Sequence, residues 1–153
     1  MNELNGAEVF FRSRMIGDAD LLALQEKRVY KDQAPQIDPE DEDADPPVYP
    51  LSVFWLIHSH DVVGLGGGRI QVQLRYGVRA ICEGSASGVR AISNRTDRVL
   101  KVTTPIQIVT NGFTYTVLGC HRVKAISGSG FDHGVHYSWK GAHWDVYMSP
   151  AKD

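Results

Sequence analysis

Apolar residues recur at helical spacing in three segments of the chain, which predicts two longer helices and a short one. The first covers residues 4–16, where apolar side chains return every three or four positions. The pattern stops before Asp18, which is placed to cap a short helix over residues 19–24. The third helix is expected over residues 85–101, with Ser85 as its N-cap. Its inward-facing positions are expected to be Val89, Ile92, Val99 and Leu100.

Apolar and alternating runs predict strands in the middle of the chain. Residues 51–63 begin with a nearly continuous apolar run, which favours a strand that is buried on both faces or covered by a helix. Glycines at 64–68 provide a turn, and residues 69–80 then alternate between polar and apolar side chains. We expect this strand to have one wet face and to break near Ile81, through a bulge or a change of partner next to Gly77. The polar face consists of Arg69, Gln71, Gln73, Arg75 and Arg79.

The last third of the chain predicts a hairpin and a further strand. Residues 106–110 and 113–118 flank Asn111-Gly112, the dipeptide that best fits a two-residue hairpin turn. The second of these strands is expected to continue to Ile126, followed by a glycine- and serine-rich loop and a strand over 135–148. This order predicts a single α+β domain over the whole chain of 153 residues, an antiparallel β-sheet with two to three α-helices packed on one face.

Residues 36–50 differ from the rest of the chain, because prolines and carboxylates replace the apolar pattern. We expect a flexible, exposed acidic loop that builds neither core nor sheet. Its carboxylates are Asp38, Glu40, Asp41, Glu42, Asp43 and Asp45. The formal net charge of the chain is −2, so leaving out these six acids gives the remainder a charge of +4.

Basic residues gather on the predicted helix 85–101, where only Asp97 opposes them. They are Arg90, Arg95, Arg98 and Lys101. One interpretation is a solvated helix face accompanied by a solubilising loop. The other is that the acidic loop of one subunit contacts the basic helix face of a neighbour and fixes their register.

No pattern in the chain predicts a catalytic, cofactor or metal site. The glycines at 64–68 are followed by a strand and not by the helix that a phosphate loop requires. His58 and His60 share one face of a strand, but no third ligand stands at a recognisable spacing. Cys82 and Cys120 lie in apolar stretches without a CxxC pair, which indicates reduced, buried thiols. We therefore expect no enzyme, no cofactor and no metal.

Membrane association is not predicted by any segment. No run approaches about 18 uninterrupted apolar residues. Residues 1–15 lack the apolar centre of a secretory signal. The chain is therefore expected to be made in the cytoplasm and to stay there until it is assembled into a larger structure.

Several segments together resemble a known family. They are the opening AEVFFRSRM, the segment DADLLALQEKRVYKDQAPQ, the strand RIQVQLRYGVRAI ahead of RAISNRTDRVL, and the closing HYSWKGAHWDVYM. In these words and in the order of its elements, nearly the whole chain resembles the tail terminator, or tail-completion, proteins of long-tailed bacteriophages. The acidic loop and the hairpin at residues 106–113 are departures from that pattern.

The resemblance implies a structural virion protein. Such proteins form a ring, usually a hexamer, that caps the tail tube, stops its polymerisation and joins the tail to the head. The partners that it implies are further copies of the chain, the tail tube protein, and a head-tail connector or other neck protein. DNA is expected to pass through the channel without specific binding. The implied location is the neck of the virion, after assembly in the host cytoplasm, with no membrane, cofactor or metal.

Interface residues of the family share no short motif, so the candidates come from this sequence. The acidic loop and the four basic residues of helix 85–101 are the candidate subunit interface. The polar strand face is a candidate for the ring surface or the lumen. A candidate docking loop consists of Ser127, Ser129, Phe131, Asp132 and His133.

Three alternatives belong to other classes. A head-tail connector or a tube subunit would share the ring but would bind the portal or polymerise instead of capping. A small monomeric ligand- or nucleic-acid-binding module would use the basic helix, although that helix lacks interleaved aromatic residues. An enzyme is the third alternative, which a tightly bound metal or a deep pocket around His58 and His60 would favour.

Overall fold

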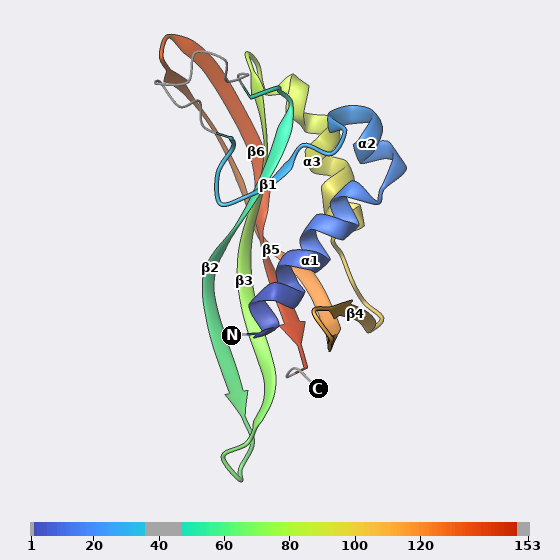
Figure 1. Ribbon diagram of the computed structural model, residues 1–153. Coiled ribbons are helices and arrows are strands. Elements are labelled where there is room, and N and C mark those ends of the chain that lie inside the picture. Colours follow the sequence, from blue (N-terminus) through green and yellow to red (C-terminus); the bar gives the residue numbers. More distant parts are fainter. Residues whose placement is uncertain (1, 36–46, 150–153) are drawn as a thin grey trace, which may run out of the picture.

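A computed structural model describes residues 2–35 and 47–149, which form a six-stranded sheet and three helices (Figure 1). The helices are α1 (Asn2–Ile16), α2 (Ala19–Gln25) and α3 (Ser87–Val99). The strands are β1 (Val29–Lys31), β2 (Leu51–Val63), β3 (Arg69–Glu83), β4 (Ile106–Thr110), β5 (Phe113–Asp132) and β6 (Val135–Met148). The chain is thus an α+β protein of one domain, and the six carboxylates of the predicted acidic loop lie outside the described residues.

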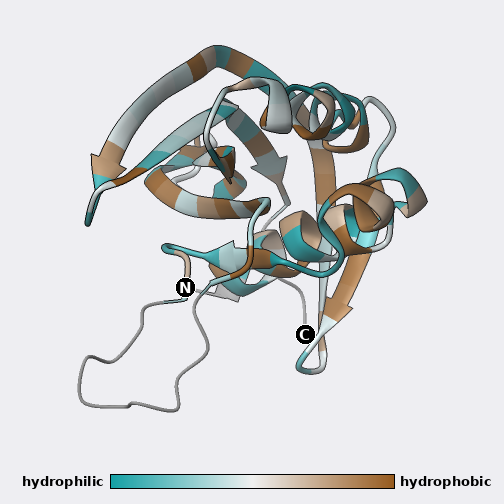
Figure 2. Ribbon diagram, turned by 90° about the horizontal axis from the view of Figure 1, so that it is seen from above, coloured by the Kyte–Doolittle hydropathy of each residue, from teal (hydrophilic) through white to brown (hydrophobic). Residues whose placement is uncertain are grey.

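The sheet is mixed, with the strand order β1-β2-β3-β6-β5-β4. β1 pairs with β2 in parallel and every other pair is antiparallel, so the prediction of an antiparallel sheet is wrong at one edge. Residues 32–50 separate these two strands, and a connection of this length allows β2 to run in the same direction as β1. Seen from above, the strands curve and do not lie in one plane (Figure 2).

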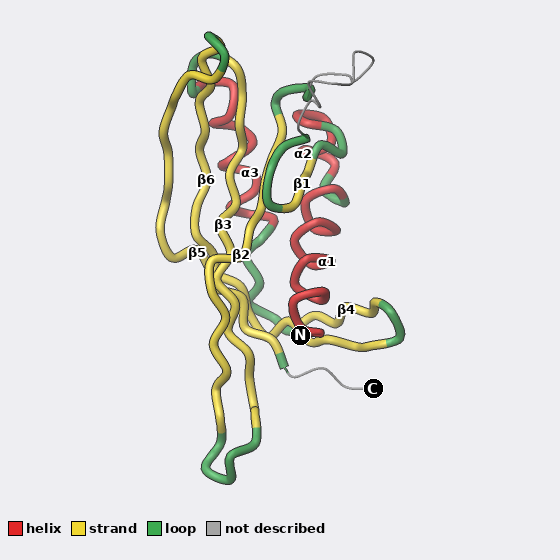
Figure 3. The backbone as a smooth tube through the Cα atoms, turned by 60° about the vertical axis from the view of Figure 1, so that its left-hand side comes forward, coloured by secondary structure: helices red, strands yellow, loops and turns green. Residues whose placement is uncertain are grey.

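Two long hairpins extend from the middle of the sheet in opposite directions (Figure 3). β2 and β3 form one, with a turn at residues 64–68, and β5 and β6 form the other. β3 runs unbroken through Ile81, so the predicted break is wrong. The pairing of β2 with β3 shifts instead between Leu56 and His58 and again between Val62 and Val63. In β2 only the first four residues are buried, whereas residues 56–61 are exposed, so the strand is covered on both faces only at its start.

The predicted glycine- and serine-rich loop is part of a strand. β5 continues through it, and the turn comes at His133 and Gly134, with φ angles of 48° and 79°. Gly128 faces Trp139 of β6, and a Cβ at this glycine would lie 2.5 Å from the indole ring. The glycine therefore makes room for an aromatic neighbour and does not mark a loop. The hairpin at Asn111-Gly112 is confirmed, with φ angles of 53° and 79°.

The core lies between the sheet and the helices α1 and α3. The rings of Phe11 and Tyr76 are 4.7 Å apart, and the ring of Phe54 stacks 6.0 Å from that of Phe11. α3 also contacts β3, since a Cβ at Gly88 would lie 3.1 Å from the Sγ of Cys82. The four inward positions predicted for α3 and the two free, buried thiols are confirmed.

Local chemistry sets the ends of the helices. Asp18 caps α2 as predicted, because its carboxylate accepts a hydrogen bond from the Leu21 N–H at 3.0 Å. Ser85 does not cap α3, since the N-cap position is Ala86 and the Ser85 hydroxyl lies 2.7 Å from that of Ser87. The prediction for Ser85 is therefore wrong, because a neighbouring side chain engages its hydroxyl.

Candidate functional site

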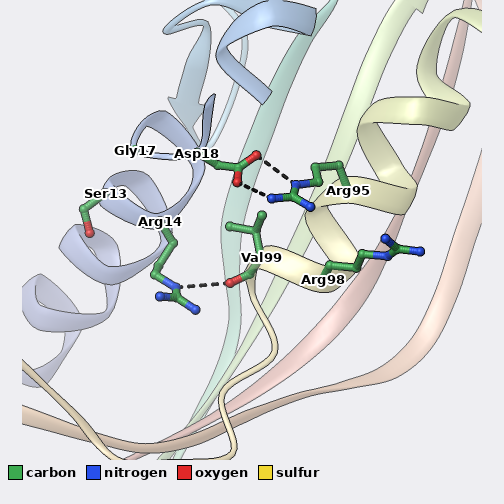
Figure 4. Close-up of a pocket in the computed structure, with 7 residues that line it drawn as sticks. All are labelled: Ser13, Arg14, Gly17, Asp18, Arg95, Arg98 and Val99. Atoms are coloured by element: carbon green, nitrogen blue, oxygen red, sulfur yellow. Dashed lines mark hydrogen bonds and ion pairs between the residues drawn. The ribbon is translucent and has the colours of Figure 1, made fainter. Parts of the chain in front are cut away.

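A groove of about 410 Å³ opens between α1, α2 and α3 (Figure 4). It is lined by Ser13, Arg14, Gly17, Asp18, Arg95, Arg98 and Val99. Arg95 and Arg98 belong to the predicted basic face, and Arg14 adds a third guanidinium from α1, whose Nε donates to the carbonyl of Val99 at 3.1 Å. The structure thus brings part of the predicted subunit interface to the edge of a polar groove.

Arg95 is already engaged within the chain. Its guanidinium donates to the two carboxylate oxygens of Asp18 at 3.0 and 2.7 Å, and the carboxylate of Asp20 lies 3.4 Å from its Nε. The hydrogen bond from Arg95 lowers the pKa of Asp18 below its ordinary value. Arg95 therefore ties α3 to the start of α2 and does not present a free charge.

The other three members of the predicted basic face are exposed: Arg90, Arg98 and Lys101. Arg98 extends away from Arg95, as Figure 4 shows. Asp97, the acid on the same helix, pairs with Arg122 of β5 at 2.7 Å and so does not neutralise them. These three charges are open to a partner, although solvation weakens any ion pair formed there.

Replacing Asp18 by alanine is expected to lower the free energy of unfolding by about 1–2 kcal/mol, because it removes both the cap of α2 and the ion pair with Arg95. Asp18→Asn, which keeps a capping side chain, should lower the free energy of unfolding by less. Urea denaturation of the two variants measures the difference. Equal stability of wild type and Asp18→Ala would contradict the role assigned to this residue.

The polar face predicted for β3 is organised around a buried acid, Asp145 of β6. Arg75 donates to its two carboxylate oxygens at 2.7 and 2.9 Å, and Gln73 donates to it at 3.1 Å. Asp145 is 4% exposed, and the hydrogen bond from Arg75 lowers its pKa. Sequence reasoning missed Asp145, whose only signal is a carboxylate at a polar position of an alternating strand.

The two ends of the predicted polar face have different surroundings. Arg69 pairs with Glu3 of α1 and lies 3.6 Å from the carboxylate of Asp61. Arg79, at the other end, has its guanidinium carbon 5.4 Å from the ring centroid of Trp55 and 5.3 Å from that of Trp139. Both distances are those of cation–π contacts. The tryptophans come from β2 and β6, so only the strand pairing brings them to Arg79 and no local sequence signal predicts the cluster.

The predicted docking residues lie at the tip of the β5–β6 hairpin. They are Ser127, Ser129, Phe131 and Asp132 in β5, and His133 in the turn. Phe131 is 78% exposed, and its ring lies 4.9 Å from that of His136. The structure therefore presents them on a projecting arm with an exposed aromatic residue, and not on a loop as predicted.

Histidines do not assemble a metal site in the part of the chain that the structure describes. His58 and His60 lie on the exposed arm of β2, opposite Arg75 and Gln73 of β3. Among residues 2–35 and 47–149, no group of three or more His, Cys, Asp and Glu side chains is placed to hold a metal ion. The guanidinium opposite His58 also disfavours a bound cation there.

Comparisons with known proteins add little to this geometry. No family model and no curated protein matches the chain. One solved structure is 14% identical, covers 94% of this chain and 94% of its own, and has a TM-score of 0.49. A similarity of this size indicates neither a family nor a function. Within the described ranges, none of the helices combines the length and apolarity needed to cross a membrane.

Proposed function

We propose that this chain is a tail terminator subunit of a long-tailed bacteriophage. In this role it forms a ring, of six copies by the family resemblance, that caps the tail tube, ends its polymerisation and contacts the head-tail connector. Its place is the neck of the virion, and the role needs contact surfaces and no catalytic residue. Besides the resemblance, one structural observation supports the proposal: the sheet has an open strand edge on each of its two sides.

The open edges belong to the two long hairpins. In the described chain β1 pairs with β2 only as far as Phe54, which leaves residues 55–63 of β2 with β3 alone as a neighbour. On the other side, the pairing of β5 with β4 and a single bridge end at Cys120. Within residues 2–35 and 47–149 this leaves residues 121–132 with β6 alone as a neighbour. Strand edges of this length, with unpaired N–H and C=O groups, are templates for a strand of another chain.

The placement of these edges favours a ring over a two-fold dimer. They are different surfaces, so a contact between them is head-to-tail and can repeat around an axis until the ring closes. From one open edge to the other the strands are β2, β3, β6 and β5, and each runs antiparallel to the next. β2 and β5 therefore run in opposite directions, so β5 of one copy meets β2 of the next in antiparallel orientation. Because the open segments lie toward opposite ends of the sheet, the strands of such a ring are tilted from its axis, as in closed barrels.

In this proposal the helices cover one face of the sheet and leave the other to the ring surface. That second face carries Gln73, Arg75 and Arg79 of the predicted polar face. Asp145 neutralises Arg75, whereas Arg79 has no ion-pair partner among residues 2–35 and 47–149. A lumen through which DNA passes without binding calls for neutral or acidic walls, since phosphates attract free cations. We therefore assign this face to contacts with other protein chains, a neighbouring copy included, and not to the lumen.

Reversing three charges of the acidic segment, in the variant Asp41→Lys, Glu42→Lys, Asp43→Lys, is expected to weaken assembly of the ring on tail tubes by tenfold or more in affinity at low salt. The reason is that the segment of one copy would no longer attract a basic surface of its neighbour. Cosedimentation with purified tail tubes measures the effect. Glu83→Lys, a reversal of an exposed carboxylate that forms no ion pair within the described residues, is the control and should assemble normally. Unchanged assembly of the triple variant would contradict the contact.

Capping itself is tested with growing tubes. Purified chain added to polymerising tail tube protein is expected to stop elongation, because the ring occupies the tip where the next tube ring would add. Electron microscopy of the products gives the length distribution. Tubes of unchanged length, or tubes that incorporate the chain along their sides, would favour a connector or a tube subunit.

A further inference from the structure

Trp55, Arg79 and Trp139 form a cluster on the side of β3 opposite α1 and α3. Glycines let the indoles lie against the sheet: a Cβ at Gly77 would be 2.2 Å from the Trp55 ring, and one at Gly128 would be 2.5 Å from the Trp139 ring. Both rings are partly buried in this position. The guanidinium of Arg79 is thus held between two rigid aromatic side chains, with little freedom to reach elsewhere.

Arg79 has no counter-ion in the described part of the chain. None of the ion pairs formed within residues 2–35 and 47–149 includes it. Its Nε is buried and has no hydrogen-bond acceptor there. By contrast Arg75, four residues earlier on the same side of β3, is fully engaged by Asp145. A buried N–H without an acceptor is costly. Nε itself is closed to solvent, so a carboxylate would bind the remaining nitrogens of this half-buried guanidinium.

We propose that Arg79, between Trp55 and Trp139, is a carboxylate-binding site whose ligand is the acidic segment 38–45 of a second copy of this chain. The proposal rests on the proposed ring in one respect, because the ring supplies the second copy. Charge complementarity supports the choice of ligand: the segment carries six carboxylates, and the rest of the chain carries +4. The indoles shield the guanidinium from water, so its attraction for a carboxylate is stronger there than at an open surface.

The basic face at α3 is the competing receiver for the same segment. Arg95 is committed to Asp18, and Arg90, Arg98 and Lys101 stand in solvent. Ion pairs at such positions are weak and are screened further by salt. Arg79 differs because it is half-buried, flanked by aromatic rings and unsatisfied at Nε. The stronger attraction for a carboxylate therefore lies on the far side of the sheet from α3.

A peptide titration tests the assignment. The host is the full chain with its own acids neutralised, so that they cannot compete for the site: Asp38→Asn, Glu40→Gln, Asp41→Asn, Glu42→Gln, Asp43→Asn and Asp45→Asn. The probe is a labelled peptide of residues 36–47, and the control peptide carries the same neutral substitutions. Fluorescence anisotropy at low ionic strength gives the dissociation constants. Tryptophan emission reports on the cluster, because Trp144, the third indole of the chain, is buried on the core side.

The acidic peptide is expected to bind at least about tenfold more tightly than the control peptide and to change the tryptophan emission. Arg79→Gln in the host should weaken binding about tenfold or more. Arg79→Lys should weaken it too, because an ammonium lacks the planar fork that a carboxylate accepts from arginine. Arg98→Gln, the matched control on α3, should change binding less than about twofold. Thermal unfolding of each variant verifies that it is folded.

Three results would overturn the proposal. Equal binding of both peptides, or no binding, would remove the carboxylate site. A loss of binding in Arg98→Gln but not in the Arg79 variants would assign the segment to α3. Rejection of the peptide by dilute, monomeric wild-type chain, with binding to the neutralised host, would show that the segment fills the site of its own copy. Tube capping is measured separately, so failure of the ring and failure of this site give different results.

Discussion

Replacing Phe11 by alanine is expected to lower the free energy of unfolding by about 3–5 kcal/mol, the range for truncation of a buried phenylalanine. Phe11 is 0% exposed, and its ring lies 5.2 Å from Phe10, 6.0 Å from Phe54 and 4.7 Å from Tyr76. These neighbours come from α1, β2 and β3, so no single side chain can move to fill the space left by the ring. Urea denaturation followed by far-ultraviolet circular dichroism measures the loss.

Phe131→Ala is the matched control for Phe11→Ala. It removes the same ring from the tip of the β5–β6 hairpin, where the side chain is 78% exposed, and should change the stability by less than about 0.5 kcal/mol. A similar loss in both variants, or a loss below about 1 kcal/mol for Phe11→Ala, would contradict the packing of α1 on the sheet.

Asp145→Asn is expected to lower the free energy of unfolding by about 2–3 kcal/mol at pH 7. The substitution leaves Arg75 without the carboxylate that binds two of its nitrogens, and it weakens the hydrogen bond from Gln73. The loss lies below that for a fully buried pair because the Arg75 side chain is 29% exposed. Asp97→Asn is the control: this acid also lies 2.7 Å from an arginine, Arg122, but the pair is more exposed and should contribute less than about 1 kcal/mol.

The effect of Asp145→Asn should depend on pH in one direction. The hydrogen bond from Arg75 lowers the pKa of Asp145 in the folded state. The ion pair therefore stabilises the fold fully above the unfolded-state pKa of about 3.9, and its contribution is lost as the pH falls through the lower folded-state pKa. The difference between wild type and variant should shrink below about pH 4. A difference that stays constant or grows on acidification would contradict the ion pair.

Features of the fold that depend on residues close together in the sequence could be predicted from it. The cap of α2 at Asp18 and the turn at Asn111-Gly112 follow from local hydrogen bonding and from the need for positive φ. Alternation likewise predicted the polar face of β3. The glycines at 128 and 130 misled the prediction, because their meaning depends on Trp139 of another strand. The parallel pairing of β1 and β2 was missed for the same reason, since it is decided across a long connection.

The candidate site shows the same difference between local signals, which the sequence reveals, and long-range contacts, which it does not. The basic residues of α3 could be recognised as a group because they share one helix, but only the structure shows that Asp18 and Asp20 occupy Arg95. Arg75 and Arg79 look equivalent in the sequence. Strand pairing makes them different, because it places a carboxylate beside the first and two indoles beside the second. Arg79, which has no ion-pair partner among the described residues, could not be distinguished from Arg75 without these long-range neighbours.

The measurement that tests the central claim most directly is negative-stain electron microscopy of a phage in which this gene is interrupted, compared with its parent. A terminator predicts overlong tails that are separate from filled heads, because nothing stops tube growth or joins the tail to the connector. Tails of normal length that only fail to attach would place the protein on the connector side. Intact particles of normal length would contradict the proposed role.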